Sequence, residues 1–326
     1  MRNAVNLQPY RASVADLSPL AAPWDGPLAL VDLSAAADGE IALPPCPVIG
    51  IGDPDHPLAA QLDCVVEPPV TLEGLATQVL ANPLAAQVIV GLLRLLPGLD
   101  AQAGLQAESL AYGVLQGSGE HARWLEQPRR SRSPPGTVTT SREDDRLDIV
   151  LQNPVPSAMG RQARDQVFEA LSLAVIDPSI QRIVLSANGR GFSMGADLAE
   201  FGTTRDPATA HAIRARTLPA HMAARCADRL EADIAGACVG AGLELAAWAH
   251  RIEAASDAWF QLPELAMGVL PGAGGCVSLT RRIGRQRTAL MILSGRRISA
   301  RTALAWGLVD ALVDQTAVDP GRKRPG

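Results

Sequence analysis

The chain has 326 residues, of which 47% are hydrophobic and only 3% aromatic, and its net charge is −5. This composition supports a buried core of aliphatic side chains, excludes disorder over the whole chain, and lacks the basic footprint of a nucleic-acid-binding protein. The five cysteines form no CxxC or Cys/His pattern, residues 1–10 do not resemble an export signal, and no apolar stretch has the length of a membrane span. We therefore expect a cytoplasmic protein with reduced thiols and no bound metal.

The first part of the chain is expected to be an α/β region with a helical second half. Buried strands are predicted by three short apolar runs, at residues 28–33, 47–51 and 63–67. Residues 71–96 have helical spacing, with Thr71 as a plausible N-cap. A second helical stretch, residues 103–126, is expected to break near Gly117 and Gly119.

This first part shows no evident chemistry. It contains no nucleophile, metal cluster or phosphate loop, and we interpret His56 and His121 as surface or capping residues. A stretch rich in Arg, Ser, Pro and Thr follows it and predicts a linker or exposed loop. The chain therefore divides into an N-terminal region, a linker, a second α/β region and a flexible tail, at residues 1–126, 127–143, 144–313 and 314–326.

After the linker, strands and helices alternate. Residues 146–152 predict a strand, residues 163–175 predict a helix that Asp177–Pro178 ends, and an apolar run from Ile183 predicts the next strand. The rhythm continues to Val313 and favours a layered α/β fold.

Two glycine-rich turns follow strands in this second region. Residues 186–200, SANGRGFSMGADLAE, carry three glycines that let the backbone approach a ligand and expose its N–H groups. Residues 236–249, GACVGAGLELAAWA, place a small-residue turn before a helix that Glu244 opens, where free N–H groups favour negative charge on a ligand. Each turn alone is more typical of a tight structural crossing between strand and helix.

A third segment, residues 258–275, contains a carboxylate in an apolar stretch, AWFQLPELAMGVLPGAGG. Pro263 fixes the backbone before Glu264, and the Pro271–Gly272 turn opens another helix. A carboxylate among apolar residues is costly unless it is partnered, solvated or protonated. Glu264 is therefore a candidate functional group.

Together, in this order and spacing, the three segments resemble the enoyl-CoA hydratase/isomerase (crotonase) superfamily. The similarity lies in GFSMGAD, in the glycine-rich turn that ends in Glu244, and in PELAMGVLPGAGG, and weaker matches extend it over residues 147–313. The resemblance implies a crotonase-like spiral of ββα units over residues 144–313.

The resemblance also implies a site. The backbone N–H groups of Ala196 and Ala241 would form the oxyanion hole, and Glu244 and Glu264 would hold and activate water. Further substrate-binding positions would be Ala158, Arg190, Met194, Gly195, Asp197, Leu198, Gly240 and Gly272. The implied activity is a lyase that adds water reversibly across the 2,3 double bond of an enoyl-CoA, as in fatty acid metabolism, with coenzyme A as part of the substrate and no other cofactor. The alternatives are an enoyl-CoA double-bond isomerase and a non-catalytic scaffold subunit.

The sequence departs from the family pattern in several places, among them His250, which replaces an acidic residue. Ala199 stands where relatives often have Lys, so CoA phosphates would need another group such as Arg190. Charges at Glu231 and Asp233 suggest a strand face that is more open to water. The helices that relatives use to cover the site and to oligomerise are missing after residue 313, whereas residues 62–126 resemble them. We therefore expect a permuted or duplicated arrangement in which the N-terminal α/β region supplies this cover, in a homotrimer or hexamer.

Overall fold

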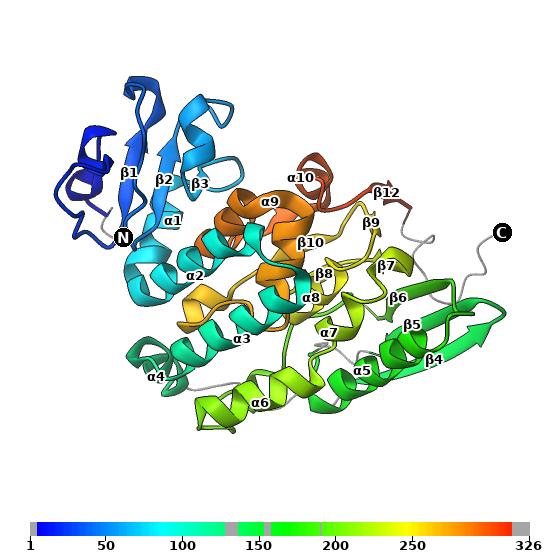
Figure 1. The fold of residues 1–326 in the computed structure, drawn as a ribbon. Coiled ribbons are helices and arrows are strands. Elements are labelled where there is room, and N and C mark those ends of the chain that lie inside the picture. The colour runs from blue at the N-terminus through cyan, green and yellow to red at the C-terminus, as the bar shows by residue number, and fades with distance from the viewer. Residues whose placement is uncertain (1–4, 128–135, 153–157, 190, 315–326) are drawn as a thin grey trace.

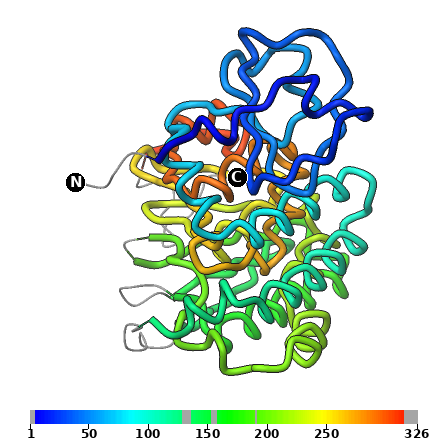
Figure 2. The backbone as a smooth tube through the Cα atoms, turned by 90° about the vertical axis from the view of Figure 1, so that its left-hand side faces the viewer, coloured from blue at the N-terminus to red at the C-terminus, as the bar shows by residue number. Residues whose placement is uncertain are grey.

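The N-terminal strands form a small parallel sheet, which packs as a lobe on the rest of the molecule (Figures 1 and 2). The computed structural model describes residues 5–127, 136–152, 158–189 and 191–314. The three predicted strands are confirmed as β1 (Ala29–Asp32), β2 (Val48–Ile51) and β3 (Cys64–Val65). Because side chains alternate along a strand, Leu30 joins the main core while Val31 joins a separate cluster on the outer face. We call β1–β3 the N-terminal sheet.

Four helices follow, and we call residues 72–125 the helical cover. They are α1 (Leu72–Ala81), α2 (Pro83–Leu95), α3 (Ala101–Gln116) and α4 (Gly119–Leu125). The Thr71 hydroxyl accepts from the Gly74 N–H at 3.3 Å, which confirms the predicted cap, and α3 and α4 part at the expected glycines. The single helix expected over residues 71–96 is wrong. Pro83 begins α2 instead, because proline fits the first helical position but lacks the N–H that would continue α1.

The apolar character of α1 and α2 is used inside the protein. Leu75, Val79, Ile89 and Leu93 are fully or almost fully buried in the main core. Within the part of the chain that the structure describes, no single helix has the length and apolar character to cross a membrane. Only α1 and α2 taken together do, and they bend by 106°.

The second region is built on a six-stranded sheet of order β12-β9-β7-β6-β5-β4. Its strands are β4 (Thr137–Glu143), β5 (Arg146–Gln152), β6 (Arg182–Asn188), β7 (Leu230–Ile234), β9 (Arg251–Ala255) and β12 (Ala311–Val313). A smaller sheet contains β8 (Ala237–Val239), β10 (Trp259–Gln261) and β11 (Ile298–Ser299). The strands predicted from residue 146 and from Ile183 are thus confirmed.

From β7 to β10 successive strands alternate between these two sheets, and helices follow strands along the second region. The helices are α5 (Arg161–Ile176), α6 (Pro207–Thr217), α7 (Ala220–Ala223), α8 (Ala241–Ala246), α9 (Gly275–Ser294) and α10 (Ala300–Ala305). From β7 the chain passes to β8 and then to α8, and from β9 it passes to β10 and then to α9. This repeat of two strands and a helix is the expected ββα spiral.

Two expectations about the sheet are wrong. The linker was expected to reach residue 143, but Thr137–Glu143 form β4, joined to β5 by a turn in which Asp144 has a φ of 53°. Because β4 exposes nearly all its side chains, it lacks the apolar alternation that would reveal a strand. Strand β7 is also less open to water than expected, since Arg182 binds Glu231 at 2.7 Å and Asp233 is buried.

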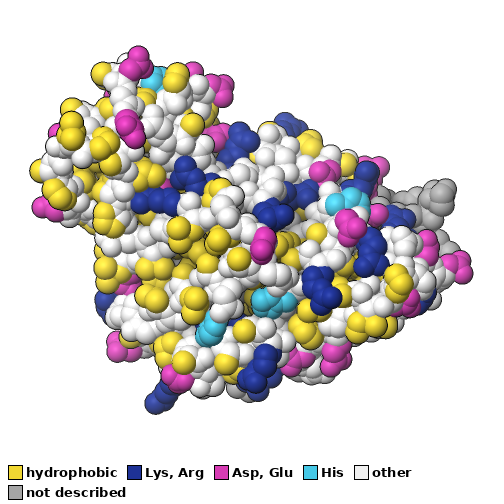
Figure 3. Space-filling model, in the orientation of Figure 1, with side chains coloured by type: hydrophobic (Ala, Val, Ile, Leu, Met, Phe, Trp, Pro, Cys, Tyr) yellow, Lys and Arg dark blue, Asp and Glu magenta, His cyan; other side chains and the backbone are white. Residues whose placement is uncertain are grey.

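The two halves of the chain share one core. Helices α1, α2 and α3 all pack against α9, and one continuous apolar cluster contains residues of both halves. Asp63, which is 1% exposed, binds Arg94 of α2 at 2.6 Å and Arg285 of α9 at 3.3 Å. Basic side chains accordingly gather along the boundary between the N-terminal lobe and the main body (Figure 3).

Candidate active site

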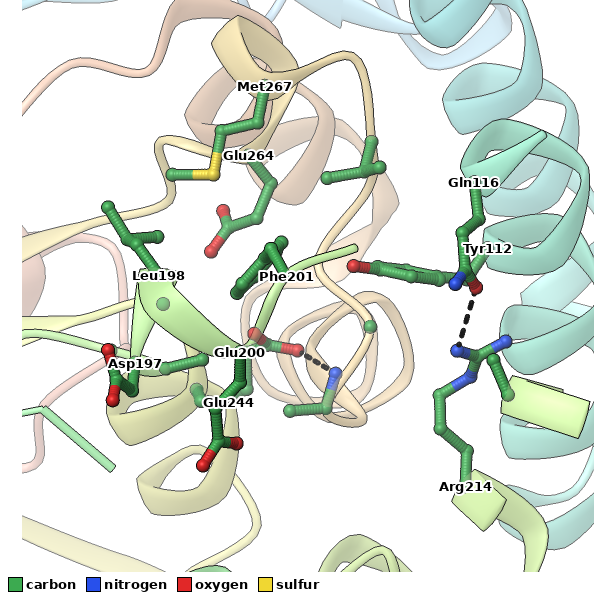
Figure 4. Close-up of a pocket in the computed structure, with 18 of the residues that line it drawn as sticks. Tyr112, Gln116, Asp197, Leu198, Glu200, Phe201, Arg214, Glu244, Glu264 and Met267 are labelled. Atoms are coloured by element: carbon green, nitrogen blue, oxygen red, sulfur yellow. Dashed lines mark hydrogen bonds between the residues drawn. The ribbon is translucent and has the colours of Figure 1, made fainter. Parts of the chain in front are cut away.

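A cavity of about 470 Å³ lies between the helical cover and the ββα core. The core contributes Glu244 and Glu264, and the cover contributes Tyr112, Gln116 and His121. Figure 4 shows the two glutamates on one side of the cavity, with Tyr112 and Gln116 facing them from the other side. The site therefore draws on both halves of the chain.

Two turns of the core meet at this cavity through glycines. Gly195 has a φ of +92° and Gly240 a φ of +48°, which side chains rarely adopt. A Cβ atom on Gly195 would lie 3.7 Å from the Cα atom of Gly240, so the two turns are in contact. The residue after each glycine, Ala196 or Ala241, lines the cavity.

The backbone N–H groups of these two alanines are free donors. The bridge between Met159 and Ala196 uses the carbonyl of Gly195 and the N–H of Asp197, and so leaves the Ala196 N–H unused. Ala241 is the first residue of α8, which begins three residues before the expected start at Glu244, and a first-turn N–H has no partner within its helix. Neither N–H donates to any group in the described ranges. Two neighbouring free N–H groups are the donor set that an oxyanion needs.

Glu244 is held by the backbone of the turn before α9. One of its oxygens accepts from the Ala273 N–H at 2.6 Å and from the Gly275 N–H at 2.9 Å. A Cβ atom on Gly275 would lie 2.4 Å from the Glu244 Cγ atom, so only glycine fits there. Burial raises the pKa of Glu244 to about 7, and the two N–H donors oppose this rise.

Glu264 lies in the short 3-10 helix Glu264–Met267 and has a different environment. Its Oε2 atom is buried without a hydrogen-bond partner among the residues the structure describes. Burial, followed by the negative charge of Glu244, raises the pKa of Glu264 well above its ordinary value. With its backbone donors, Glu244 is the carboxyl that ionises first, which leaves Glu264 protonated.

A third carboxylate, Glu108 of α3, acts on the same turn from the other half of the chain. Its oxygens accept from the Gly274 N–H at 2.7 Å and from the Cys276 N–H at 2.9 Å. Glu244 takes the alternate N–H groups of this segment, so Glu108 and Glu244 hold it from two sides. Glu108 was not among the predicted site residues, although Glu108, Tyr112 and Gln116 are spaced four apart and so share one helical face.

Tyr112 and His121 line the cavity, although the first part of the chain was expected to show no chemistry. A Cβ atom on Gly272 would lie 2.2 Å from Tyr112 Cδ2, so the glycine makes room for this ring. The Tyr112 hydroxyl has no hydrogen-bond partner in the described part of the chain, and burial raises its pKa, so it stays protonated. His121 is buried, with its Nδ1 2.9 Å from the Met267 carbonyl oxygen, whereas His56 caps a short helix as expected.

Most of the positions singled out in the sequence reach the cavity. Its lining includes all four proposed catalytic and oxyanion-hole residues and six of the substrate-binding positions, Met194, Gly195, Asp197, Leu198, Gly240 and Gly272. Ala158 is not part of the lining, and Arg190 lies outside the described residues. Three arginines that the sequence analysis did not consider also line it: Arg161, Arg164 and Arg214.

The second region of the chain is similar to known proteins. Residues 144–320 match the family model described as enoyl-CoA hydratase/isomerase. The chain is 35% identical over 173 residues to 2,3-dehydroadipyl-CoA hydratase of Escherichia coli, a match that covers 53% of this chain and 67% of the relative. It is also 33% identical over 175 residues to the peroxisomal bifunctional enzyme of Danio rerio. This match covers 52% of this chain but only 23% of that longer protein.

Solved structures show the same fold. Subunit I of an enoyl-CoA hydratase from Geobacillus kaustophilus is 30% identical and superposes with a TM-score of 0.51. The match covers 57% of this chain and 72% of that one.

Proposed function

The chain belongs to the enoyl-CoA hydratase/isomerase family, and we propose that within it this protein is a hydratase, adding water reversibly across the 2,3 double bond of an enoyl-CoA thioester. The carrying observation is the pair of cavity carboxyls, Glu244 and Glu264, whose surroundings favour different protonation states. Addition of water needs one group that accepts a proton and one that gives a proton, and such a pair supplies both.

The mechanism assigns one step to each group. The Ala196 and Ala241 N–H groups hold the thioester oxygen as negative charge develops on it, and each such donor is typically worth about 3 kcal/mol of barrier. Glu244, ionised, removes a proton from water, whose oxygen bonds to C3. Glu264, protonated, gives its proton to C2, so that water is added in full and both carboxyls can exchange protons with solvent before the next turnover.

Coenzyme A is part of the substrate and provides the groups by which the enzyme binds it. The proposed reaction requires no further cofactor. Arg161 is exposed at the start of α5 and lines the cavity together with Arg164. Both suit the phosphates of coenzyme A, because guanidinium groups bind phosphate well. For the assembly, we propose a homotrimer or hexamer, in which the helical cover takes the position that helices at the other end of the chain have in relatives.

The test is turnover of crotonyl-CoA by the purified full-length protein, followed as loss of the absorbance of the conjugated thioester. We expect loss of absorbance and formation of the 3-hydroxyacyl-CoA. An isomerase would leave crotonyl-CoA unchanged but would generate conjugated absorbance from a 3-enoyl-CoA. A scaffold subunit would bind the thioester, measured by calorimetry, without converting either compound. Either result would contradict the hydratase proposal.

A further inference from the structure

The cavity contains a guanidinium group that makes no direct ion pair with any carboxylate of the described residues. Arg214 of α6 is half-buried, and no carboxylate of the described residues lies within 4.0 Å of it, although ten such ion pairs occur elsewhere in those residues. The groups in direct contact with it are neutral. Nε donates to the Ser109 hydroxyl at 3.0 Å, Nη2 donates to the Ser109 carbonyl at 3.1 Å, and the group lies 4.5 Å from the centre of the Tyr112 ring.

These contacts fix the direction of the charge but do not neutralise it. Burial lowers the pKa of Arg214 and outweighs the more distant charge of Glu108, which acts in the opposite direction, so its surroundings disfavour the cation. A buried charge without an opposite charge is costly, and a partner that arrives with the ligand removes this cost. Because α3 holds the guanidinium through Ser109 and Gln116, the group is also preorganised for such a partner.

The position of Arg214 indicates which part of a ligand it would meet. Figure 4 shows Arg214 beside Tyr112 and Gln116, across the cavity from Glu264 and Glu244. The exposed Arg161, by contrast, lies beside Glu200, whose Oε1 accepts from the Arg161 N–H at 2.9 Å. Coenzyme A is bulky and highly charged, so it must leave through an open side such as this one. The half-buried side at α3 and α6 remains for the acyl chain.

We propose that Arg214 and the Tyr112 hydroxyl form a subsite for a carboxylate at the far end of the acyl chain. The substrate class is then an enoyl-CoA derived from a dicarboxylic acid rather than from a simple fatty acid. This inference rests on the proposed function. The unpartnered guanidinium supplies the charge, and the Tyr112 hydroxyl, which is protonated and free, supplies a second donor.

The experiment compares two enoyl-CoA thioesters of equal chain length, one ending in a carboxylate and one in a methyl group. The wild-type protein should have a higher kcat/KM for the carboxylate ester. Arg214→Met should reduce kcat/KM for that ester by about 100-fold, as expected when a charge-assisted hydrogen bond is lost. The same substitution should change kcat/KM for the methyl ester by less than about threefold.

Two further variants separate the contribution of the Tyr112 hydroxyl from nonspecific effects of replacing an arginine in α6. Tyr112→Phe removes only the hydroxyl and should cost the carboxylate ester about fivefold. Arg216→Met is the matched control, because Arg216 lies on the same helix but is exposed and outside the cavity lining. It should leave both esters unaffected.

The contrary results are distinct from one another. Equal loss on both esters in Arg214→Met would make Arg214 a structural link between α3 and α6. A loss that disappears with thioesters of dephospho-coenzyme A would place Arg214 at the coenzyme phosphate. Either would overturn the subsite. If the wild-type protein hydrates neither ester, the proposed function is wrong. Binding affinities measured by calorimetry then test the subsite separately. Tighter binding of the carboxylate ester than of the methyl ester supports the subsite, and equal binding contradicts it.

Discussion

The N-terminal sheet and the helical cover come from the same half of the chain but relate differently to the cavity. The sheet packs one face on the main core and closes its other face with its own loops, in a separate cluster around Val31 and Leu33. The cover has no such cluster of its own. Its apolar side chains belong to the main core, and it places Glu108 and Tyr112 against the turn and the cavity.

The part of the chain that builds the site therefore does not end at the linker between the two regions. Residues 1–126 were placed in one region, of which residues 62–126 were expected to resemble the covering helices; in the structure the cover lines the cavity, and the N-terminal sheet contributes no residue to its lining. We therefore expect substitutions to affect catalysis strongly in the core, moderately in the cover and weakly in the N-terminal sheet.

The largest effect is expected from deleting residues 1–126. The deletion exposes the apolar face of α9 and removes Glu108, and unburied apolar surfaces of this size are poorly tolerated. The remaining core should be insoluble or aggregated, measured by size-exclusion chromatography, and without hydratase activity. A soluble, folded fragment that binds acyl-CoA as well as the full chain would show instead that this region is an independent accessory domain.

In the core, Glu264→Gln should lower kcat for hydration by about a thousandfold. The amide keeps the shape of the side chain but cannot give a proton. Calorimetric affinity for an acyl-CoA should change little, because the side chain acts on the proton rather than on binding. Turnover close to that of the wild-type protein would remove Glu264 from the mechanism.

At the oxyanion hole, Ala241→Pro should lower kcat by about a hundredfold, because proline removes the N–H proposed to stabilise the oxyanion. Ala241 is the first residue of α8, where proline is compatible with a helix. Ala241→Gly keeps the N–H and serves as the control, with an expected change of a few fold. Similar activities in two variants with unchanged melting temperatures would show that the oxyanion assignment is wrong.

One pair of substitutions compares the effects of the cover and of the N-terminal lobe on catalysis. Leu105 of the cover and Leu33 of the N-terminal lobe are both almost fully buried. Replacing either one by Ala should lower the free energy of unfolding of the protein by about 3 kcal/mol. A Cβ atom on Gly274 would lie 3.3 Å from Leu105 Cδ2, so Leu105 supports the turn that binds Glu244. Leu105→Ala should therefore reduce kcat by about tenfold, and Leu33→Ala should leave it unchanged. Equal effects on kcat would erase the distinction.

The sequence predicted the features that depend on neighbouring residues. The predicted strands and the Thr71 cap are confirmed, and the motif residues Ala196, Ala241, Glu244 and Glu264 all line the cavity, because turns and short apolar runs act over a few positions. It did not predict Glu108 at the turn before α9, since that contact joins residues 166 positions apart. It also missed β4, which is held by backbone pairing and carries no apolar alternation.

The central claim is that both halves of the chain build one catalytic site, and Glu108→Gln tests it. The matched control is Glu120→Gln, because Glu120 is another buried carboxylate of the cover that holds the first N–H groups of a helix, those of Leu84 and Ala85 in α2. Comparing kcat and KM for the two variants and the wild-type protein over a range of pH separates a positioning role from general destabilisation.

In the wild-type protein, kcat should rise as the pH increases through about 7, where Glu244 becomes ionised, and should fall at higher pH as Glu264 loses its proton. Glu108→Gln should lower kcat by about tenfold with little change in KM. It should also move the alkaline limb to lower pH. Burial and the charge of Glu244 raise the pKa of Glu108 as well, so Glu108 becomes charged at high pH, and its charge then helps to raise the pKa of Glu264. Glu120→Gln should retain the wild-type profile. If Glu108→Gln also retained that profile and kcat, the helical cover would be a lid on a site that the core completes alone.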